Sequence, residues 1–178
     1  PVPCGSSGCQ MGGWFRKEIR SMADIRGLKM RIPALGGEII ARAGGTPVTM
    51  PGSEIFTSLQ SGAIDAAEWI GPYNDLAFGL HKAAKYYYYP GWQEPGSTLE
   101  MIINEAAFEG LPEDLREIVL TCASATNDRM AAEFTARNAE ALQTLIRDHG
   151  VQVRPYPDDV MRELQRLSAE VLAEASGT

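Results

Sequence analysis

Glycine and proline are distributed very unevenly along this chain of 178 residues, and their distribution limits the folds that it can adopt. Of the 18 glycines, 15 lie at or before Gly96, and 8 of the 11 prolines do too. Both residues interrupt regular structure, so the front part is predicted to consist of short elements joined by turns. From residue 113 to about residue 148 neither occurs, which predicts one long helix, or two helices joined by a kink.

Composition and charge exclude several classes of protein. Hydrophobic residues make up 44% of the chain and charged residues 22%, so it has enough apolar side chains for a core and is not predicted to be disordered. The formal net charge of −7 argues against a nucleic-acid partner, which requires clustered lysine and arginine. No apolar run approaches the roughly 20 residues that span a bilayer. The start at Pro1, without a signal-peptide pattern, suggests a processed protein or a fragment.

The front part alternates between strand and helix patterns. Strands are predicted at residues 28–32, 46–50 and 63–69, and helices at residues 37–43 and 53–60. Strand–helix–strand order with connections of a few residues is typical of βαβ units. The predicted fold class is therefore α/β, with a parallel or mixed sheet and flanking helices.

Further elements follow until the composition changes near residue 111. They are a helix at 72–82, strands at 85–89 and 97–104, the long helix, a strand at 151–154 and a last helix that begins near 157. One of these strands contains four consecutive tyrosines, Tyr86 to Tyr89. Because a strand turns alternate side chains to opposite faces, two of the four rings are predicted to pack in the core.

The three cysteines indicate neither a metal site nor a redox motif, since no Cys-x-x-Cys pattern occurs. Cys4 and Cys9 are close enough in sequence to pair across a short loop in an oxidising compartment, and the sequence leaves that pairing open. Cys122 lies in a helical pattern and is predicted to be buried.

Common catalytic signatures are absent: there is no Walker A motif, no Gly-x-Ser-x-Gly and no His-Glu-x-x-His. The glycines between residues 5 and 13 are numerous enough to cradle an anion, but the phosphate-loop lysine is missing. The histidines, His81 and His149, lie in helical stretches beside charged residues and are predicted to face solvent. No catalytic residue is assigned.

Residues at the ends of predicted strands are better candidates, because ligands of open α/β sheets bind at the carboxyl ends of strands. Arg31 is next to last in its strand, and its guanidinium group matches a carboxylate in shape. Glu68 and Trp69 end another strand, and Glu94 follows a strand and a Pro-Gly turn. Two acids at strand ends are consistent with oxygen ligands of a hard cation, or with unrelated surface carboxylates. Arg31 is equally consistent with a surface ion pair.

Five segments, taken together and in order, resemble the TRAP-type (tripartite ATP-independent periplasmic) solute-binding proteins. They are Met-Gly-Gly-Trp-Phe-Arg-Lys-Glu-Ile at 11–19, Gly-Leu-Lys-Met-Arg at 27–31, Ile-Asp-Ala-Ala-Glu-Trp at 64–69, Gly-Pro-Tyr at 71–73 and Tyr-Tyr-Tyr-Tyr-Pro-Gly-Trp at 86–92. The similarity is greatest to the branch that binds 2-oxo acids and related small monocarboxylates. It covers nearly the whole chain. The resemblance implies that the chain corresponds to the C-terminal part of longer, two-lobed proteins and is expected to lack their N-terminal lobe portion.

The resemblance implies a periplasmic-binding-protein-like fold and a binding site made of five residues. Arg31 is expected to bind the ligand carboxylate. Glu68, Glu94 and the backbone carbonyl of Trp69 are expected to hold a sodium or calcium ion that bridges to the ligand. Gln10 is expected to reach the cation or the ligand.

The resemblance also implies a role. It suggests a periplasmic receptor that binds a small organic acid such as pyruvate and delivers it to the membrane permease of a TRAP transporter, without chemistry. Residues 1–110 are expected to form the ligand-binding lobe segments. Residues 111–178 are expected to bridge lobes or form a homodimer, since family members with such a helix are often swapped dimers. The residues alone leave an alternative, an α/β metal-dependent enzyme that uses Glu68 and Glu94, although no activated nucleophile is visible.

Overall fold

The computed structural model describes residues 1–177. The strands are β1 (Val2–Cys9), β2 (Gly13–Phe15), β3 (Lys29–Arg31), β4 (Thr46–Val48), β5 (Ala66–Ala67), β6 (Tyr86–Tyr89), β7 (Gly96–Met101) and β8 (Gln152–Pro155). The helices are α1 (Ala34–Arg42), α2 (Gly52–Ser61), α3 (Pro72–Ala77), α4 (Glu105–Glu109), α5 (Glu113–Arg147) and α6 (Asp158–Ser176), with the 3-10 turns η1 (Met22–Asp24) and η2 (Leu80–Lys82). No helix among the described residues is long and apolar enough to cross a membrane.

The main sheet is mixed, and the predicted α/β class is confirmed. Its strands lie in the order β4-β3-β5-β2-β6-β8. β3 runs parallel to β4 and β5, and β6 runs parallel to β8, but β2 lies antiparallel between β5 and β6. Gly13 permits this insertion: its φ is +119°, and a Cβ there would lie 2.8 Å from the Ala67 carbonyl oxygen. Only glycine fits that position.

Several predicted elements are shorter in the structure. The strand predicted at 63–69 is reduced to β5, two residues long. The helix predicted at 72–82 divides into α3 and η2 at Gly79, whose φ of +71° ends one helix and starts the other. Both differences arise because neighbouring strands and turns, rather than local propensity, decide where these short elements end.

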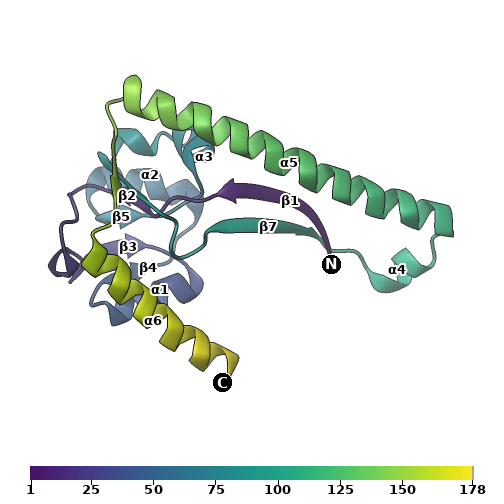
Figure 1. Cartoon of the computed structure of the whole chain (residues 1–178), viewed down its shortest axis with the longest axis horizontal. Coiled ribbons are helices and arrows are strands. Elements are labelled where there is room, and N and C mark those ends of the chain that lie inside the picture. Colours follow the sequence, from purple (N-terminus) through teal and green to yellow (C-terminus); the bar gives the residue numbers. More distant parts are fainter. Residues whose placement is uncertain (178) are drawn as a thin grey trace.

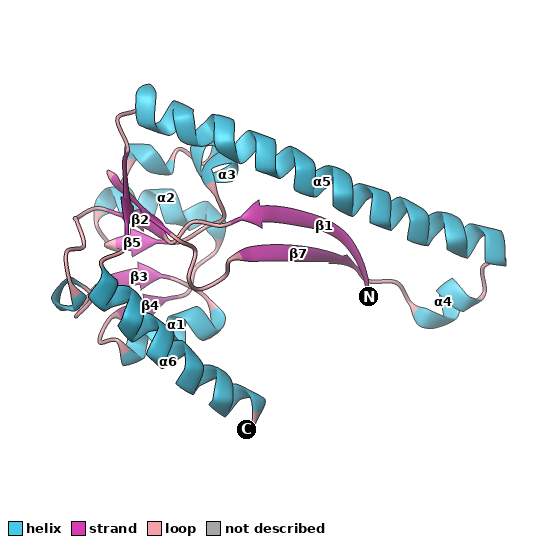
Figure 2. Cartoon of the chain, viewed as in Figure 1, coloured by secondary structure: helices cyan, strands magenta, loops and turns pink. Residues whose placement is uncertain are grey.

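A separate ribbon of two antiparallel strands, β1 and β7, extends from the body alongside α5 (Figures 1 and 2). No strand is predicted from the sequence at residues 2–9, so β1 is an element that only the structure reveals. Cys4 and Cys9 are both free. β1 is irregular, so that Pro3 to Cys9 lies opposite only Glu100 to Gly96. Even so, the Cα atoms of Cys4 and Cys9 are separated by roughly 10 Å or more, which is too far for a disulfide. This geometry argues against the Cys4–Cys9 pairing that the sequence left open.

The sheet has a hydrophobic core on each face. One core includes Met30, Ile32 and Tyr88 of the strand regions together with Val160 and Leu164 of α6. The other is formed around the following residues of β2, α2, β6 and α5: Trp14, Ile55, Leu59, Tyr87 and Leu145. Two of the four tyrosine rings are buried, as predicted, but they belong to the adjacent residues Tyr87 and Tyr88, because each face of the sheet has its own core.

The long helix is confirmed as a single helix, α5, of 35 residues. It runs along β1 and continues past the body of the protein (Figure 1). Only Ala123, Ala141 and Leu145 of this helix are buried. The prediction that Cys122 is buried is wrong, because its side chain lies on the exposed side of the helix. Helical spacing identifies an apolar face but does not tell whether another element covers it.

The first residue of α1, Ala34, has a φ of +50°, in the left-handed region that disfavours a side chain. We expect Ala34→Gly to raise the free energy of unfolding by about 0.5–1 kcal/mol, because relief of strain outweighs the added freedom of the unfolded chain. Ala41→Gly, at an exposed position within the same helix, should instead lower it by about 1 kcal/mol. Urea denaturation measures both variants. Equal destabilisation by the two would contradict strain at Ala34.

Candidate ligand and cation site

Arg31 and Glu68 meet at the edge of the sheet where parallel strands β3 and β5 both end. The Glu68 N–H donates to the Arg31 carbonyl oxygen at 3.1 Å, so the backbone itself aligns the two residues. Arg31 Nη1 donates to the Glu68 carbonyl oxygen at 2.9 Å and also contacts the Glu68 carboxylate. The two side chains are only 11% and 4% exposed. The sequence placed them at the ends of two strands, and the resemblance joined them into one site. The structure brings them into an ion pair that is buried rather than at the surface.

Glu94 lies on the turn that follows β6 and is linked to Gln10 through Ser97. Gln10 Nε2 donates to Ser97 Oγ at 2.7 Å, and Ser97 Oγ in turn donates to Glu94 Oε1. Gln10 is buried, while Glu94 is exposed. Two residues proposed from the sequence are therefore connected by a third, Ser97, which the sequence did not single out. Its only signal is its position three residues after Glu94.

Glu68 and Glu94 line one cavity of about 210 Å³. The rest of its wall is formed by the start of α1 and the residue before it, together with Gln93; these residues are Pro33, Ala34, Leu35, Gly36 and Gln93. Trp69 is placed differently: its ring packs at 5.4 Å from the Arg31 guanidinium carbon. The Trp69 side chain therefore packs against Arg31. Of the five predicted site residues, Glu68 and Glu94 line this cavity, whereas Gln10, Arg31 and Trp69 are not among its lining residues.

Two buried amide oxygens near the acids have no hydrogen-bond partner within the described residues. They are Gln10 Oε1 and Gln93 Oε1. A buried polar atom without a partner is costly, and carbonyl oxygens together with carboxylates are the ligands that hard cations take. Residues 1–177 contain no group of three or more His, Cys, Asp or Glu suited to a metal. A cation here would have two carboxylates and neutral oxygens, which fits sodium or calcium better than a transition metal.

Sequence reasoning missed Gln93, although it stands in the same turn as Glu94. Its Nε2 donates to the Met11 carbonyl oxygen at 3.1 Å, which ties the turn after β6 to the segment that carries Gln10. Because that bond uses the amide nitrogen, the amide oxygen is left for another partner. A glutamine beside an acid has no distinctive sequence pattern, so only the fold reveals it.

Glu68 is the most perturbed acid of this site. Burial raises its pKa to about 7; Arg31 opposes this shift, and the negative charges of Glu94 and Asp75 add to it. A single arginine thus offsets only part of the cost of burying this carboxylate. A bound cation would supply positive charge at the same place, so the electrostatics favour cation binding.

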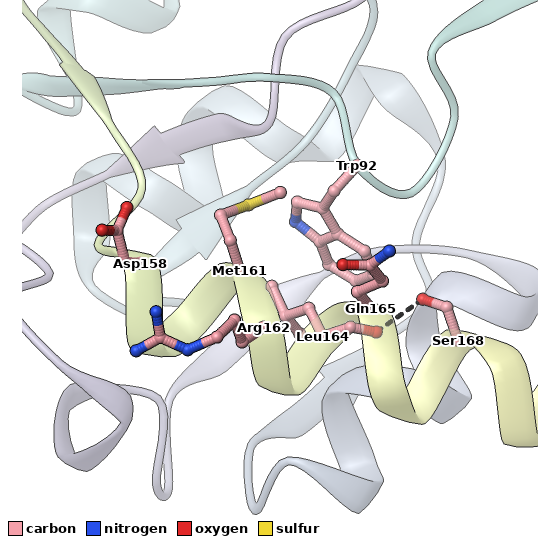
Figure 3. A pocket seen from close by; sticks show the side chains of 7 residues that line it. All are labelled: Trp92, Asp158, Met161, Arg162, Leu164, Gln165 and Ser168. Carbon is pink, nitrogen blue, oxygen red and sulfur yellow. Dashed lines mark hydrogen bonds between the residues drawn. The ribbon is translucent and has the colours of Figure 1, made fainter.

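Other hollows lie away from these residues. A hollow of about 550 Å³ runs along α6 beneath Trp92 and is lined by Met161, Arg162 and Gln165, among others (Figure 3). None of the five predicted site residues lines it. Neither histidine lines the cavity shared by Glu68 and Glu94. His149 is exposed, as predicted, but His81 is half-buried; the two rings lie with centroids 4.1 Å apart and planes tilted by 32°.

A mixed α/β sheet that presents an arginine, two acids and unpartnered amide oxygens at strand ends defines the lobe of a small-ligand-binding protein. Comparison with known families gives the class more closely. Residues 4–177 match the family described as bacterial extracellular solute-binding protein, family 7, and the chain belongs to that family.

Individual relatives agree with this assignment. The chain is 48% identical over 172 residues to a monocarboxylate 2-oxoacid-binding periplasmic protein of Nostoc. The matched region covers 97% of this chain and 47% of the relative. It is 41% identical to a TRAP periplasmic solute-binding protein from Pseudoalteromonas atlantica with bound sodium and pyruvate, with a TM-score of 0.89 over 99% of this chain and 54% of that one. A Bordetella bronchiseptica TRAP solute-binding protein, a mixed-occupancy dimer with calcium and picolinate, is 41% identical, with a TM-score of 0.91 over 99% of this chain and 52% of that one.

The chain spans about half the length of the relatives it matches. Those relatives are named as binding proteins, and the comparisons give no support to the alternative of a metal-dependent enzyme. The names also place the related proteins in the periplasm.

Proposed function

We propose that this chain is the ligand-binding part of a periplasmic TRAP receptor for a small 2-oxo acid, such as pyruvate, bound together with a sodium or calcium ion. The observation that carries the proposal is the cavity shared by Glu68 and Glu94, with Gln10 Oε1 and Gln93 Oε1 left without partners nearby. The relatives described above bind pyruvate with sodium, or picolinate with calcium. Delivery of the acid to a TRAP membrane permease completes the proposed role.

The chemistry of a 2-oxo acid suits this set of residues. Such a ligand has a carboxylate and an adjacent carbonyl oxygen, and both can bind one hard cation. Glu68, Glu94, the Trp69 carbonyl oxygen and Gln10 would hold the cation. Arg31 would pair with the ligand carboxylate, because no hydrogen bond within residues 1–177 engages its Nη2.

The charges also balance in this arrangement. Two glutamates and an anionic ligand carry three negative charges, and Arg31 with a divalent cation carries three positive charges. Buried charges need such partners to be tolerated. Gln10 and Trp69 would also contact the ligand, Trp69 from its position against the Arg31 guanidinium group. Residues 1–110 supply all of these groups in this proposal, whereas residues 111–178 contribute α5, β8 and α6.

A thermal-shift titration of the full-length protein that carries this chain tests the proposal. We expect pyruvate to raise the melting temperature, and to raise it further when calcium or sodium is present, because a ligand that binds only the folded state stabilises it. Acetate, which lacks the 2-oxo group, is the matched control and should have a smaller effect. The receptor function would be excluded by the absence of any shift with 2-oxo acids.

We also propose that α5 mediates homodimer formation. The start of this helix extends past the body of the protein (Figure 1). Near that end the helix exposes Leu115 and Ile118, the latter 55% exposed. Apolar side chains on an unpaired helix face are typical of interfaces between copies. We expect light scattering of the full-length protein to give the mass of a dimer at micromolar concentration. A monomer mass across that range would contradict the proposal.

A further inference from the structure

A buried carboxylate, Asp75 of α3, connects three segments behind the proposed cation site. Its side chain is 1% exposed. Oδ2 accepts hydrogen bonds from Trp14 Nε1 at 2.8 Å and from the Tyr87 hydroxyl at 2.7 Å. Oδ1 accepts from the backbone N–H of Ile70 at 3.2 Å. Asp75 thus binds β2, β6 and the loop that follows β5.

The bond to Ile70 matters because of the peptide unit to which that N–H belongs. The carbonyl of the same unit is that of Trp69. In a planar trans peptide the N–H and C=O point in opposite directions, so anchoring the Ile70 N–H on Asp75 turns the Trp69 oxygen away from it. The Ile70 carbonyl oxygen accepts from the Met11 N–H at 3.1 Å, which fixes the next peptide unit to the residue after Gln10.

We propose that Asp75 is a positioning residue of the cation site, acting by orienting the Trp69–Ile70 peptide so that its carbonyl oxygen is available to a cation. The inference rests on the proposed function, in which that oxygen is a cation ligand. It assigns to Asp75 a role in cation affinity that is distinct from its packing in the core.

The donors around Asp75 explain why a carboxylate is required. Trp14 Nε1, the Tyr87 hydroxyl and the Ile70 N–H all donate to it. A carboxylate accepts from all three, but an amide of the same shape has only one accepting oxygen. Asp75→Asn therefore leaves its NH2 group facing either Ile70 or Trp14. When it faces Ile70, the Trp69–Ile70 peptide loses its anchor.

The test is a calcium titration of the full-length protein at saturating pyruvate, together with its melting temperature. We expect Asp75→Asn to weaken calcium binding by about tenfold or more, as changes to residues that orient metal ligands do. Tyr88→Phe is the matched control. This variant removes the buried Tyr88 hydroxyl, which accepts from the Ile19 N–H and donates to the Ile19 carbonyl oxygen. Tyr88 lies on the face of the sheet opposite to Tyr87 and Asp75. Tyr88→Phe should lower the melting temperature and leave calcium affinity within about twofold of wild type.

A rescue experiment separates positioning from packing. In the double variant Asp75→Asn with Trp14→Phe, the competing indole N–H is gone, so the amide oxygen can stay on Ile70 while its NH2 group donates to the Tyr87 hydroxyl. We expect calcium affinity to recover although the melting temperature falls further. Wild-type calcium affinity in Asp75→Asn, or no recovery in the double variant, would overturn the inference.

The wild-type protein provides a measurement that does not depend on the folding of a variant. A cation bound to the Trp69 carbonyl polarises that peptide, so the 15N resonance of Ile70 should shift on calcium addition more than that of Ala77, which lies at the far end of α3. An unchanged Ile70 resonance in protein that binds calcium would remove the Trp69 carbonyl oxygen from the proposed cation ligands and overturn the role of Asp75, while leaving the receptor function itself intact. Failure of the wild-type protein to bind calcium and pyruvate would instead reject the proposed function.

Discussion

Arg31→Ala in the full-length protein should abolish the rise in melting temperature that pyruvate causes. The guanidinium group is the only side-chain cation proposed to pair with the ligand carboxylate, and its Nη1 already holds Glu68. Removing it also leaves Glu68 buried without its positive partner. We therefore expect the free energy of unfolding near pH 8 to fall by about 3 kcal/mol, the usual cost of breaking a buried ion pair. Thermal shift with pyruvate and urea denaturation measure the two effects.

The matched control for this variant is Arg42→Ala. Arg42 also pairs with acids, Glu38 and Glu174, but at the surface. Exposed pairs contribute little to stability, and Arg42 bonds only to Glu38 and Glu174 among the described residues, not to any residue of the proposed site. Its removal should therefore preserve the pyruvate response. A pyruvate response retained by Arg31→Ala would remove this arginine from the ligand site.

Calcium affinity should increase with pH up to about pH 7, and Glu68→Gln should remove that dependence. Burial raises the pKa of Glu68 to about 7, so below that pH a proton occupies the carboxylate and competes with the cation. One competing proton reduces the apparent affinity by about tenfold for each pH unit below the pKa. Isothermal titration of calcium at saturating pyruvate, from pH 5.5 to pH 8, measures this slope in both proteins.

The cation-free protein should show the opposite trend in stability. The folded-state pKa of Glu68 lies above its ordinary value of 4.5, so the folded protein holds this proton more tightly than the unfolded chain does. The stabilisation is therefore present below about pH 4.5 and is lost as the pH rises through 7. Glu68→Gln should lack this contribution.

The control for the calcium titration is Glu100→Gln, which changes an exposed acid on β7 and should keep the wild-type dependence of calcium affinity on pH. An unchanged slope in Glu68→Gln would exclude Glu68 as the competing group.

Most strands and helices of the fold could be predicted from the sequence, but two strands could not. The strand and helix patterns predicted β3, α1, β4, α2 and β6 near their observed places, because apolar periodicity and turn residues act locally. β1 and β2 were missed. Both are rich in glycine or short, and they become strands only by pairing with β7, β5 and β6, which lie far along the chain.

Some residues of the candidate site could likewise be proposed from the sequence, whereas others were found only in the structure. Arg31, Glu68 and Glu94 could be proposed because chemistry-bearing residues at strand ends are informative, and the resemblance to TRAP receptors joined them into one set with Gln10 and Trp69. Their assignment to a ligand and a cation stays a prediction that the variants above test. Gln93, Ser97 and Asp75 could not be found, because their importance lies in which polar atoms they face.

The sequence by itself determined the α/β class, the long uninterrupted helix and the alternation of the tyrosine strand, since each follows from spacing along the chain. The tertiary structure alone decided the antiparallel position of β2, the exposure of Cys122, the Arg31–Glu68 ion pair and the amide oxygens left without partners. These depend on contacts between residues distant in sequence, and hydrogen-bond satisfaction and burial are properties of such contacts.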